Sequence, residues 1–415
     1  MVIAIVNDIG NCLFGLVKAY LYGFCKSRKK QFVMSFTINT EGNKMLAGFK
    51  VRNYRNFRDE LQFSLESEKN YEFNQEAIYN GIIKDSVVVG YNASGKTNLG
   101  WAIMDIIIHL TDKREKRKGE TSSLFYSNLY NQDDIVSFAY KFKFDSSFVE
   151  YSYEKKNAQQ VVRESVKIDG KKVLLNDTDD CFVHLKGSEN LNLDNWDSSI
   201  SLVKYVYANT ILDKEDKDCR VFLKFMKFVN QMLWFNSTER LKAIGANSIS
   251  GDMLEAICNL ENGIENLENF LQEARLPFKL LEKDTGEGKT IYCKIGNKEV
   301  AFAPLMSSGT RALVFLCLWY MQKEDLSFIF IDEFDAFYHT DLSIAVIHKL
   351  MMEKNIQVVF TSHNTDVISN ELLRPDCYFI LDDNAIQPFC NLTDKSLREA
   401  HNLQKMYKAG AFYEQ

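Results

Sequence analysis

Residues 86–97 read SVVVGYNASGKT, an apolar run followed by a loop with glycines at positions 90 and 95. The last eight residues satisfy the pattern G-x-x-x-x-G-K-[ST] in full, and its glycines allow a backbone to wrap around a phosphate. The β-branched run before the loop predicts a buried strand, and the apolar spacing of residues 97–110 predicts a helix. This context favours a phosphate-binding loop over a β–α turn with a chance lysine. Within the loop, Lys96 would reach the β- and γ-phosphates and Thr97 would ligate Mg²⁺.

A second pattern, FIFIDE at residues 328–333, is an apolar strand that ends in two adjacent carboxylates. Asp332 is expected to hold the shell of Mg²⁺. Glu333 is expected to polarise an attacking water as a general base. A strand that merely ends in a capping acidic pair is the alternative, which the presence of the phosphate-binding pattern disfavours.

Two further segments could face the same ligand. VVFTSHN at residues 358–364 predicts a buried strand that ends near His363, and at the carboxyl edge of a parallel sheet this histidine would point into the ligand crevice. LMSSGTR at residues 305–311 places Ser307, Ser308 and Gly309 before an apolar helix. Such residues can form an anion-binding nest, although a plain helix N-cap explains them equally well.

The rest of the chain alternates between strand and helix patterns. Period-two alternation predicts paired strands from residue 45 and an antiparallel β region over about 135–175. Residues of about 197–275 have a mostly helical pattern and are interpreted as a helical insertion. From residue 310 onward, apolar strands alternate with helices, which is typical of a mostly parallel sheet covered on both faces. We therefore predict an α/β fold with a mostly parallel core sheet, an antiparallel β subdomain and a helical insertion.

Composition limits the classes of function. The chain has 415 residues, of which 46% are hydrophobic, enough for one large or two modest domains. Its formal net charge of −6 gives no global argument for nucleic-acid binding. Nine cysteines without a metal-ligand spacing argue against a zinc site and indicate reduced thiols in a cytoplasmic protein.

Residues 1–44 are interpreted as an N-terminal extension, separate from a head that spans residues 45–415. An apolar run there is followed by the basic cluster KSRKK at residues 26–30. A surface or dimer-packing helix, an upstream extension of a chain that starts at Met34 or Met45, and membrane contact all remain open. Asn7, Asp8 and other polar residues interrupt the run, which disfavours a membrane span.

The order of these patterns resembles the RecF-, SMC- and OLD-like branch of ABC-type P-loop ATPases. GYNASGKTNL resembles the Walker A motif of this branch, which often has asparagine at the position of Asn92. MSSGTR resembles the ABC signature in its SSGT form, FIFIDEFDAFYH resembles Walker B with the D-loop, and FTSHN resembles the switch-histidine strand. FKVRNYRNF at residues 49–57 resembles the opening strand, whose arginine, here Arg55, often meets the nucleotide. The resemblance covers about residues 45–412 and is closest to compact bacterial AAA-domain ATPases without a coiled coil, which occur beside nuclease or RNA-directed effectors in phage defence.

The resemblance implies ATP and Mg²⁺ as ligands and a composite site. In such proteins two heads dimerise, and the signature loop of each head closes on the ATP held by the other. Catalytic roles fall on Glu333, His363 and Lys96, and metal ligation falls on Thr97 and Asp332. The implied nucleotide-binding residues are Arg55, Gly90, Asn92, Ala93, Ser94, Gly95, Lys96, Thr97, Asn98, Ser307, Ser308 and Gly309. The sequence departs from the pattern at residues 338–340, where YHT replaces LHP, and Gln132 is a candidate for the Q-loop glutamine by position only.

The leading interpretation is a cytoplasmic ATPase that forms a homodimer or larger homo-oligomer through ATP and controls a separate, nuclease-like effector in antiphage defence. The alternative is a DNA-repair or DNA-structure-sensing ATPase whose heads clamp nucleic acid, with basic residues such as those at 113–118 on phosphates. The acidic stretch at residues 177–180 is interpreted as a solvated loop rather than as part of a nuclease centre. A membrane transporter subunit is disfavoured, because the signature form and the opening strand belong to the DNA-repair-like branch.

Overall fold

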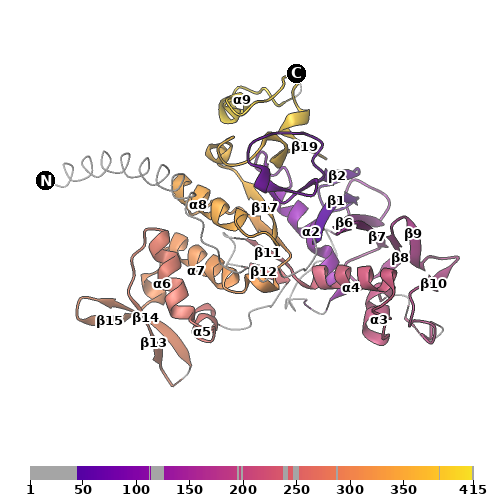
Figure 1. Ribbon diagram of the computed structural model, residues 1–415, viewed down its shortest axis with the longest axis horizontal. Helices are drawn as coiled ribbons and strands as arrows, with labels where there is room; N and C mark the ends of the chain where they lie inside the picture. Colours follow the sequence, from indigo (N-terminus) through magenta and orange to yellow (C-terminus); the bar gives the residue numbers. More distant parts are fainter. Residues whose placement is uncertain are drawn as a thin grey trace. The chain divides into compact units, whose positions relative to one another are not determined.

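The computed structural model describes residues 44–111, 113, 126–193, 196–197, 200–236, 242–245, 252–286, 288–382 and 384–413 (Figure 1). All of them belong to one compact unit that comprises residues 43–415. The predictions for residues 1–43, and for most of the basic segment 113–118, lie outside the described residues. Within the described part of the chain, no helix combines the length and hydrophobicity that crossing a bilayer requires.

A seven-stranded sheet forms the core, and its five central strands are parallel. In spatial order its strands are β12 (Lys242–Gly245), β11 (Met232–Asn236), β16 (Phe328–Asp332), β17 (Gln357–Ser362), β5 (Asp85–Val89), β18 (Tyr378–Asp382) and β19 (Ala385–Pro388). The register pairs Ile331 with Phe360 and Ser362 with Val89. The carboxyl ends of β16, β17 and β5 therefore meet at one edge, where ligands bind in open α/β sheets.

A second seven-stranded sheet is antiparallel and includes the predicted β region. In spatial order its strands are β10 (Cys181–Val183), β9 (Lys171–Asn176), β8 (Val161–Ile168), β7 (Ser147–Lys155), β6 (Val136–Phe144), β1 (Lys44–Arg52) and β2 (Leu61–Ser64). Along β6 every second side chain is buried, which is the pattern of a strand with one covered face. Two small sheets contain β3 (Ile78–Tyr79) with β4 (Ile82–Ile83), and β13 (Leu280–Asp284) with β14 (Lys289–Ile295) and β15 (Lys298–Ala301).

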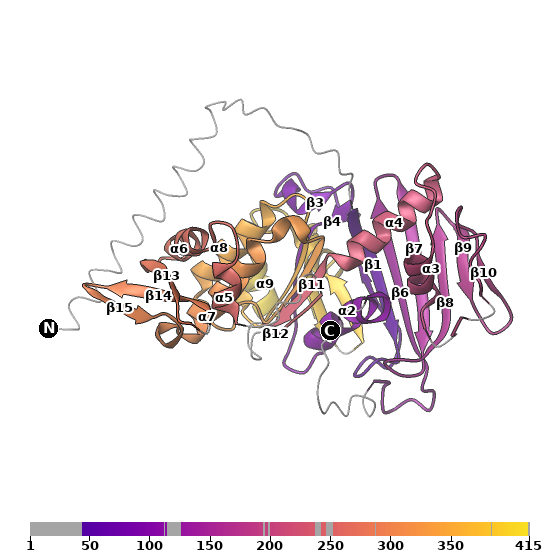
Figure 2. The same ribbon diagram turned by 90° about the horizontal axis from the view of Figure 1, so that it is seen from below.

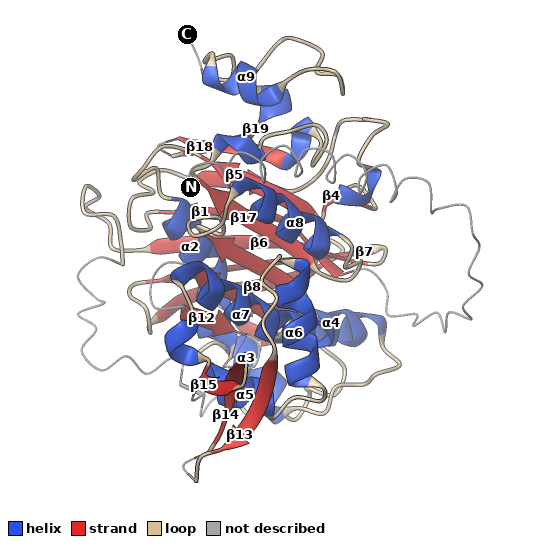
Figure 3. Ribbon diagram, turned by 90° about the vertical axis from the view of Figure 1, so that its left-hand side faces the viewer, coloured by secondary structure: helices blue, strands red, loops and turns tan. Residues whose placement is uncertain are grey.

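The described residues form eight α-helices, whose places beside the sheets are seen in Figures 2 and 3. They are α2 (Lys96–Leu110), α3 (Leu202–Asn209), α4 (Lys217–Asn230), α5 (Met253–Cys258), α6 (Gly263–Glu273), α7 (Ser308–Tyr320), α8 (Thr340–Met351) and α9 (Leu403–Lys408). α4 packs on β6, β7 and β8, and α2 packs on β11 and β16 of the core sheet. The Tyr140 hydroxyl of β6 donates to the Ala102 carbonyl of α2 at 3.0 Å, so α2 joins the two sheets.

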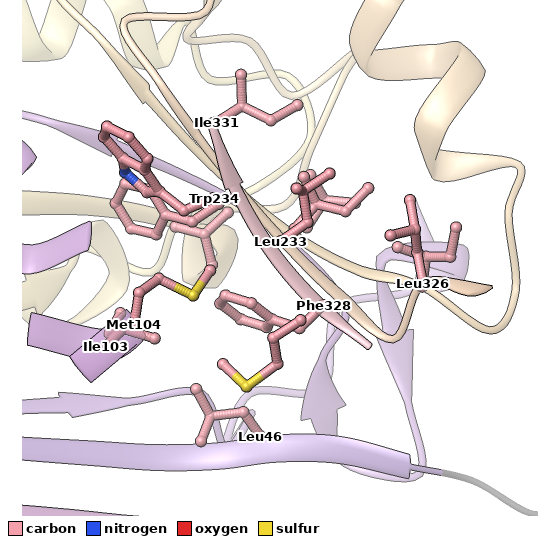
Figure 4. Close-up of a cluster of buried hydrophobic side chains, with 14 of the residues drawn as sticks. Leu46, Ile103, Met104, Leu233, Trp234, Leu326, Phe328 and Ile331 are labelled. Atoms are coloured by element: carbon pink, nitrogen blue, oxygen red, sulfur yellow. The ribbon is translucent and has the colours of Figure 1, made fainter. Parts of the chain in front are cut away.

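The core lies around α2, where apolar side chains from both sheets meet. Figure 4 shows Leu46 of β1, Met104 of α2 and Phe328 of β16 in one cluster of buried side chains. On β11, Trp234 packs on Trp101 of α2 with 4.6 Å between ring centroids, while Phe235 contacts Phe315 of α7 at 5.7 Å. Neighbouring residues of this strand thus contact helices on opposite faces of the sheet. Burying side chains of this size stabilises the fold by about 1.5–3 kcal/mol each.

The predicted helical insertion at about residues 197–275 is not one helical block. It contains α3 to α6, but the core strand β11 and the edge strand β12 interrupt it. The run MLWFN continues directly from the apolar pattern of α4, and periodicity alone cannot separate a short fully buried strand from a helix. Elsewhere α2 begins at Lys96, one residue before the helix predicted at residues 97–110, and β17 ends at Ser362, directly before His363. Such differences are no larger than the usual fraying of element ends.

Candidate active site

The predicted phosphate-binding loop connects β5 to α2, as its motif requires. Lys96 is the first residue of α2, and its Nζ donates to the carbonyls of Gly90 at 2.8 Å and Tyr91 at 3.0 Å. Gly95 has a φ of 102°, and a Cβ at this position would lie 2.4 Å from Nδ2 of Asn56. Glycine is therefore favoured at position 95 for its backbone conformation, and it leaves room for the Asn56 side chain.

The loop has the properties of an anion cradle. The Ser94 hydroxyl is buried and has no hydrogen-bond partner among the described residues. Asn92 and Ala93 form an exposed turn, with Ala93 at a φ of 64°. The loop leads directly into the N-terminus of a 15-residue helix, whose free N–H groups favour negative charge. Burial lowers the pKa of Lys96 to about 8, although Asp332 and Glu333 act in the opposite direction. These residues fit a phosphate group.

Asp332 lies at the carboxyl end of β16 and is completely buried. Burial raises its pKa above the ordinary value, and donors from Thr361, Thr97 and Asn236 offset part of this effect. The Thr361 hydroxyl donates to Oδ1 at 2.7 Å, and Nδ2 of Asn236 donates to Oδ2 at 2.8 Å. The two predicted metal ligands, Thr97 and Asp332, are therefore neighbours. A hydroxyl and a carboxylate are oxygen donors of the kind that Mg²⁺ takes, usually together with waters and substrate phosphates.

Glu333 follows Asp332 in a backbone conformation that is rare for its type, with a φ of 49°. Its N–H donates to the Thr361 hydroxyl at 2.8 Å, which helps to hold this conformation. Nε2 of His363 lies 3.8 Å from Oε1 of Glu333. Burial first, and the charge of Lys96 second, lower the pKa of His363 below its ordinary value, which favours the neutral imidazole. The strained backbone at Glu333 places its carboxylate beside the His363 ring. Strained backbone conformations of this kind are common at functional sites.

Three polar residues that were not predicted complete this arrangement. Thr361 contacts both Asp332 and the N–H of Glu333, and Asn236 lies opposite Asp332 in the register of β11 and β16. Gln132, the candidate chosen by position, is exposed on the loop before β6. The run MLWFN could have indicated Asn236, because it has the same form as FIFID: four apolar residues followed by a polar one.

The third unpredicted residue, Asn56, connects the opening strand region to the phosphate-binding loop. Nδ2 of Asn98 donates to Oδ1 of Asn56 at 2.6 Å, and Nη1 of Arg55 donates to Oδ1 of Asn98 at 3.1 Å. The Arg55 guanidinium also lies over the ring of Trp101, 5.6 Å from its centroid. The predicted pair Arg55 and Asn98 therefore lies beside the loop, and the guanidinium offers a second positive charge there.

The predicted signature residues begin α7. Ser307 is the N-cap, and its Oγ accepts from the N–H of Thr310 at 3.1 Å. Ser307 and Ser308 are exposed, and a Cβ on Gly309 would lie 2.9 Å from the carbonyl oxygen of Phe337. The hydrogen bonds of Ser307 stay within its own turn of helix. The helix α7 packs against α5 and α6.

One protein-family model matches the segment that contains the signature residues and the acidic pair. Residues 248–369 match the family model described as an AAA domain, putative AbiEii toxin, of a type IV toxin–antitoxin system. This segment contains the signature residues, Asp332, Glu333 and His363. The match covers less than half of the chain, so it is a similarity of this segment. With the phosphate-binding loop between β5 and α2 and a mostly parallel core sheet beside an antiparallel one, the chain has an α/β fold of the P-loop type.

The solved structures that resemble this chain include SMC head domains and a RecF protein. The SMC head domain from Thermotoga maritima is 14% identical, with a TM-score of 0.41 over 83% of this chain and 98% of the other. An SMC head from Pyrococcus furiosus, with an extended coiled coil and bound to the C-terminal domain of ScpA, is 13% identical, with a TM-score of 0.42 over 88% and 98%. The recombination mediator protein RecF is 14% identical, with a TM-score of 0.38 over 84% and 99%. The comparison with curated proteins gives no match.

Proposed function

We propose that this chain binds ATP with Mg²⁺ and hydrolyses it to ADP and phosphate. The observation that carries the proposal is the convergence of Lys96, Asp332, Glu333 and His363 at the carboxyl edge of β5, β16 and β17. MgATP supplies the transferable phosphoryl group and the cation that neutralises its charge. Each of the four side chains then has a role that its surroundings support.

Lys96 and the loop hold the phosphates, and Thr97 with Asp332 holds the metal. Glu333 accepts the proton of the attacking water, a role that needs a carboxylate within reach of one water molecule. The lowered pKa of His363 favours its neutral imidazole, which can donate one hydrogen bond and accept another beside Glu333. Arg55 adds positive charge on the side of Asn98.

ATP also joins two copies of the chain in this proposal. The supporting observation is that Ser307 and Ser308 are exposed at the start of a 13-residue helix and are not engaged with the chain's own phosphate-binding loop. Hydroxyls and N–H groups at a helix start favour an anion. Ser308 and Gly309 of one copy therefore complete the site that Lys96 of the other copy begins, and hydrolysis releases the pair.

Ser308→Arg is expected to prevent this pairing and to lower ATP hydrolysis by about 10²-fold, as losing a transition-state donor does. Binding of ATP to a single copy should persist, because Lys96, Thr97 and Asp332 are untouched. The measurement combines light scattering, with and without ATP, with a phosphate-release assay. Ser152→Arg, at an exposed serine on the antiparallel sheet, is the matched control and should behave like the parent chain.

A mixing experiment tests whether the two halves come from different copies. Ser308→Arg and Lys96→Ala are each inactive alone in this proposal. Mixed, they can form one intact composite site, from Lys96 of the first variant and Ser308 of the second, so hydrolysis should return. If Ser308→Arg alone keeps the parental rate, or if the mixture of two inactive variants stays inactive, the proposed role of the signature in a second copy is wrong.

We further propose that pairing controls a separate, nuclease-like effector in antiphage defence. Two observations support a separate effector. No group of three or more His, Cys, Asp or Glu side chains in the described ranges could hold a metal ion by itself. In the acidic stretch 177–180, Asp177 pairs with Arg163 at 3.0 Å and accepts from the N–H of Thr178, as a structural loop residue does. The family description, which names a toxin–antitoxin system, supports a role in such a defence system.

Asn236→Ala is expected to change the pH dependence of hydrolysis. Nδ2 of Asn236 donates to the ionised form of Asp332, so its removal raises the pKa of Asp332 further. Because Asp332 must be ionised to hold the metal, activity should be lost at a higher pH than in the parent chain when the pH falls. The check is a pH profile of kcat/KM at saturating Mg²⁺. Asn209→Ala, which removes an exposed amide that bonds within α3, is the control, and an unmoved acid limb in Asn236→Ala would contradict the role.

A further inference from the structure

The C-terminal segment lies against two loops of the candidate site. Residues 403–413, here called the C-terminal strap, comprise α9 and the turn that follows it. Figures 1 and 3 show α9 beyond β19, at the end of the core sheet that includes β5. No sequence motif assigns this segment a role apart from its place at the end of the family resemblance.

The strap is anchored in the core and is not a loose tail. Leu403 and Phe412 are each 1% exposed, and the ring of Phe412 lies 4.4 Å from that of Phe389 between centroids. Phe389 in turn packs on Tyr378, the first residue of β18. Before the strap, Nδ2 of Asn370 donates to the carbonyls of residues 398, 399 and 401 at 2.9–3.2 Å. The start of the strap is therefore held through Asn370, and its end is fixed to the core sheet through Phe389 and Tyr378.

One end of the strap contacts the phosphate-binding loop. The ring of Tyr413 lies 5.6 Å from the ring of Tyr91 between centroids, with an angle of 30° between the planes. The Tyr413 hydroxyl donates to the Tyr407 hydroxyl at 2.8 Å, so Tyr413 is itself held by α9. Tyr91 is 64% exposed and its carbonyl accepts from Lys96. The tilted ring pair is thus a contact between the tip of this loop and the rest of the fold.

The other face of the strap contacts the loop after His363. Nε2 of Gln404 donates to Oδ1 of Asp366, and Nζ of Lys408 lies 3.3 Å from the same oxygen. The N–H of Asp366 donates to Oδ1 of Asn364, the residue directly after His363, at 2.9 Å. A chain of contacts therefore runs from Tyr91 through the strap to the backbone beside His363.

We propose that the C-terminal strap holds the phosphate-binding loop and the loop after His363 in a fixed relation, with Tyr413 and Asp366 as positioning residues. The proposal rests on the proposed function, since both loops carry groups that would act on ATP. Neither residue touches the reacting atoms. Tyr413 acts through Tyr91 and the loop backbone, and Asp366 acts through Asn364 and the backbone at His363.

The test is amide hydrogen exchange of the nucleotide-free protein, followed by ATP binding and turnover. Tyr413→Ala should accelerate exchange at least about threefold in residues 91–95 and also in residues 364–368, because a lost aromatic contact loosens both loops. Residues 280–301 of the separate β13–β15 sheet should exchange as in the parent chain. ATP binding should weaken by about three- to tenfold, which corresponds to one lost aromatic pair. Asp366→Asn should lower kcat by a similar factor and leave the KM for ATP unchanged.

Two further variants keep the test decisive. Tyr91→Ala removes the same contact from an exposed position and should reproduce the effects of Tyr413→Ala even if Tyr413→Ala folds poorly. Tyr207→Ala, at another exposed tyrosine, is the matched control. Unchanged exchange in both loops of Tyr413→Ala and Tyr91→Ala would overturn the strap proposal, whether or not the protein hydrolyses ATP. A parent chain that neither binds nor hydrolyses ATP would overturn the proposed function, while the exchange data still decide the role of the strap.

Discussion

Glu333→Gln is expected to slow ATP hydrolysis by about 10²- to 10⁴-fold while ATP binding stays near the parental level. Glutamine has the shape of glutamate but cannot accept the proton of an attacking water. The groups that hold the nucleotide, Lys96, Thr97 and Asp332, keep their surroundings. A chain that binds ATP and does not hydrolyse it should therefore remain paired, because the release step is removed.

The backbone at residue 333 makes this substitution more informative than most. Glu333 has a φ of 49°, and its N–H bonds to the Thr361 hydroxyl. Glutamine can form the same backbone bond and carries no additional steric cost in this conformation. A loss of hydrolysis in Glu333→Gln can thus be attributed to the carboxylate and not to a collapse of the turn.

The measurements are phosphate release, the dissociation constant for ATP, and mass by light scattering with ATP and Mg²⁺. Glu324→Gln, at an exposed glutamate before β16, is the control and should match the parent chain in all three. Identifying what co-purifies with Glu333→Gln would also test for the proposed effector. If Glu333→Gln turned over ATP at the parental rate, its assignment as the general base would be wrong.

The parts of the site that could be predicted are those in which a strand runs directly into its functional residues. Lys96 and Thr97 follow β5 within one local pattern, and Asp332 and Glu333 end β16 in the same way. In both segments, a few consecutive residues determine the end of the strand and the position of the functional groups that follow it. The parallel core sheet was predictable for the same reason, since its strands are short apolar runs separated by helices.

The parts that could not be predicted depend on pairing between distant segments. Asn236 reaches Asp332 only because β11 lies beside β16, and β11 was hidden within an apolar pattern that continues from α4. Asn56 reaches the loop only because the turn after β1 folds back over residues 94–98. The contact between Tyr91 and Tyr413 joins positions near opposite ends of the described chain. Neither a local hydrophobic periodicity nor a short motif predicts such contacts.

Lys96→Ala is expected to weaken ATP binding by about 10- to 100-fold, the cost of losing a charged hydrogen bond in a partly buried site. It should also abolish ATP-dependent pairing, because too little ATP remains bound to join two copies. The side chain currently donates to the carbonyls of Gly90 and Tyr91, so its ammonium already lies within the loop that would receive the phosphates. Lys172→Ala, at an exposed lysine of β9, is the control for loss of one positive charge.

The pH dependence of binding separates an electrostatic role of Lys96 from a structural one. Burial lowers the pKa of Lys96 to about 8, so the free protein loses this charge as the pH rises through that value. The phosphates stay anionic, and ATP binding to the parent chain should therefore weaken progressively above about pH 8. Arginine stays protonated throughout this range, so Lys96→Arg should lack that dependence even if its shape weakens binding overall. Lys96→Ala should lack it as well, because no titrating group remains at the position. A dependence of equal slope in all three proteins would assign it to another group, and Lys96 would then serve only to hold the loop.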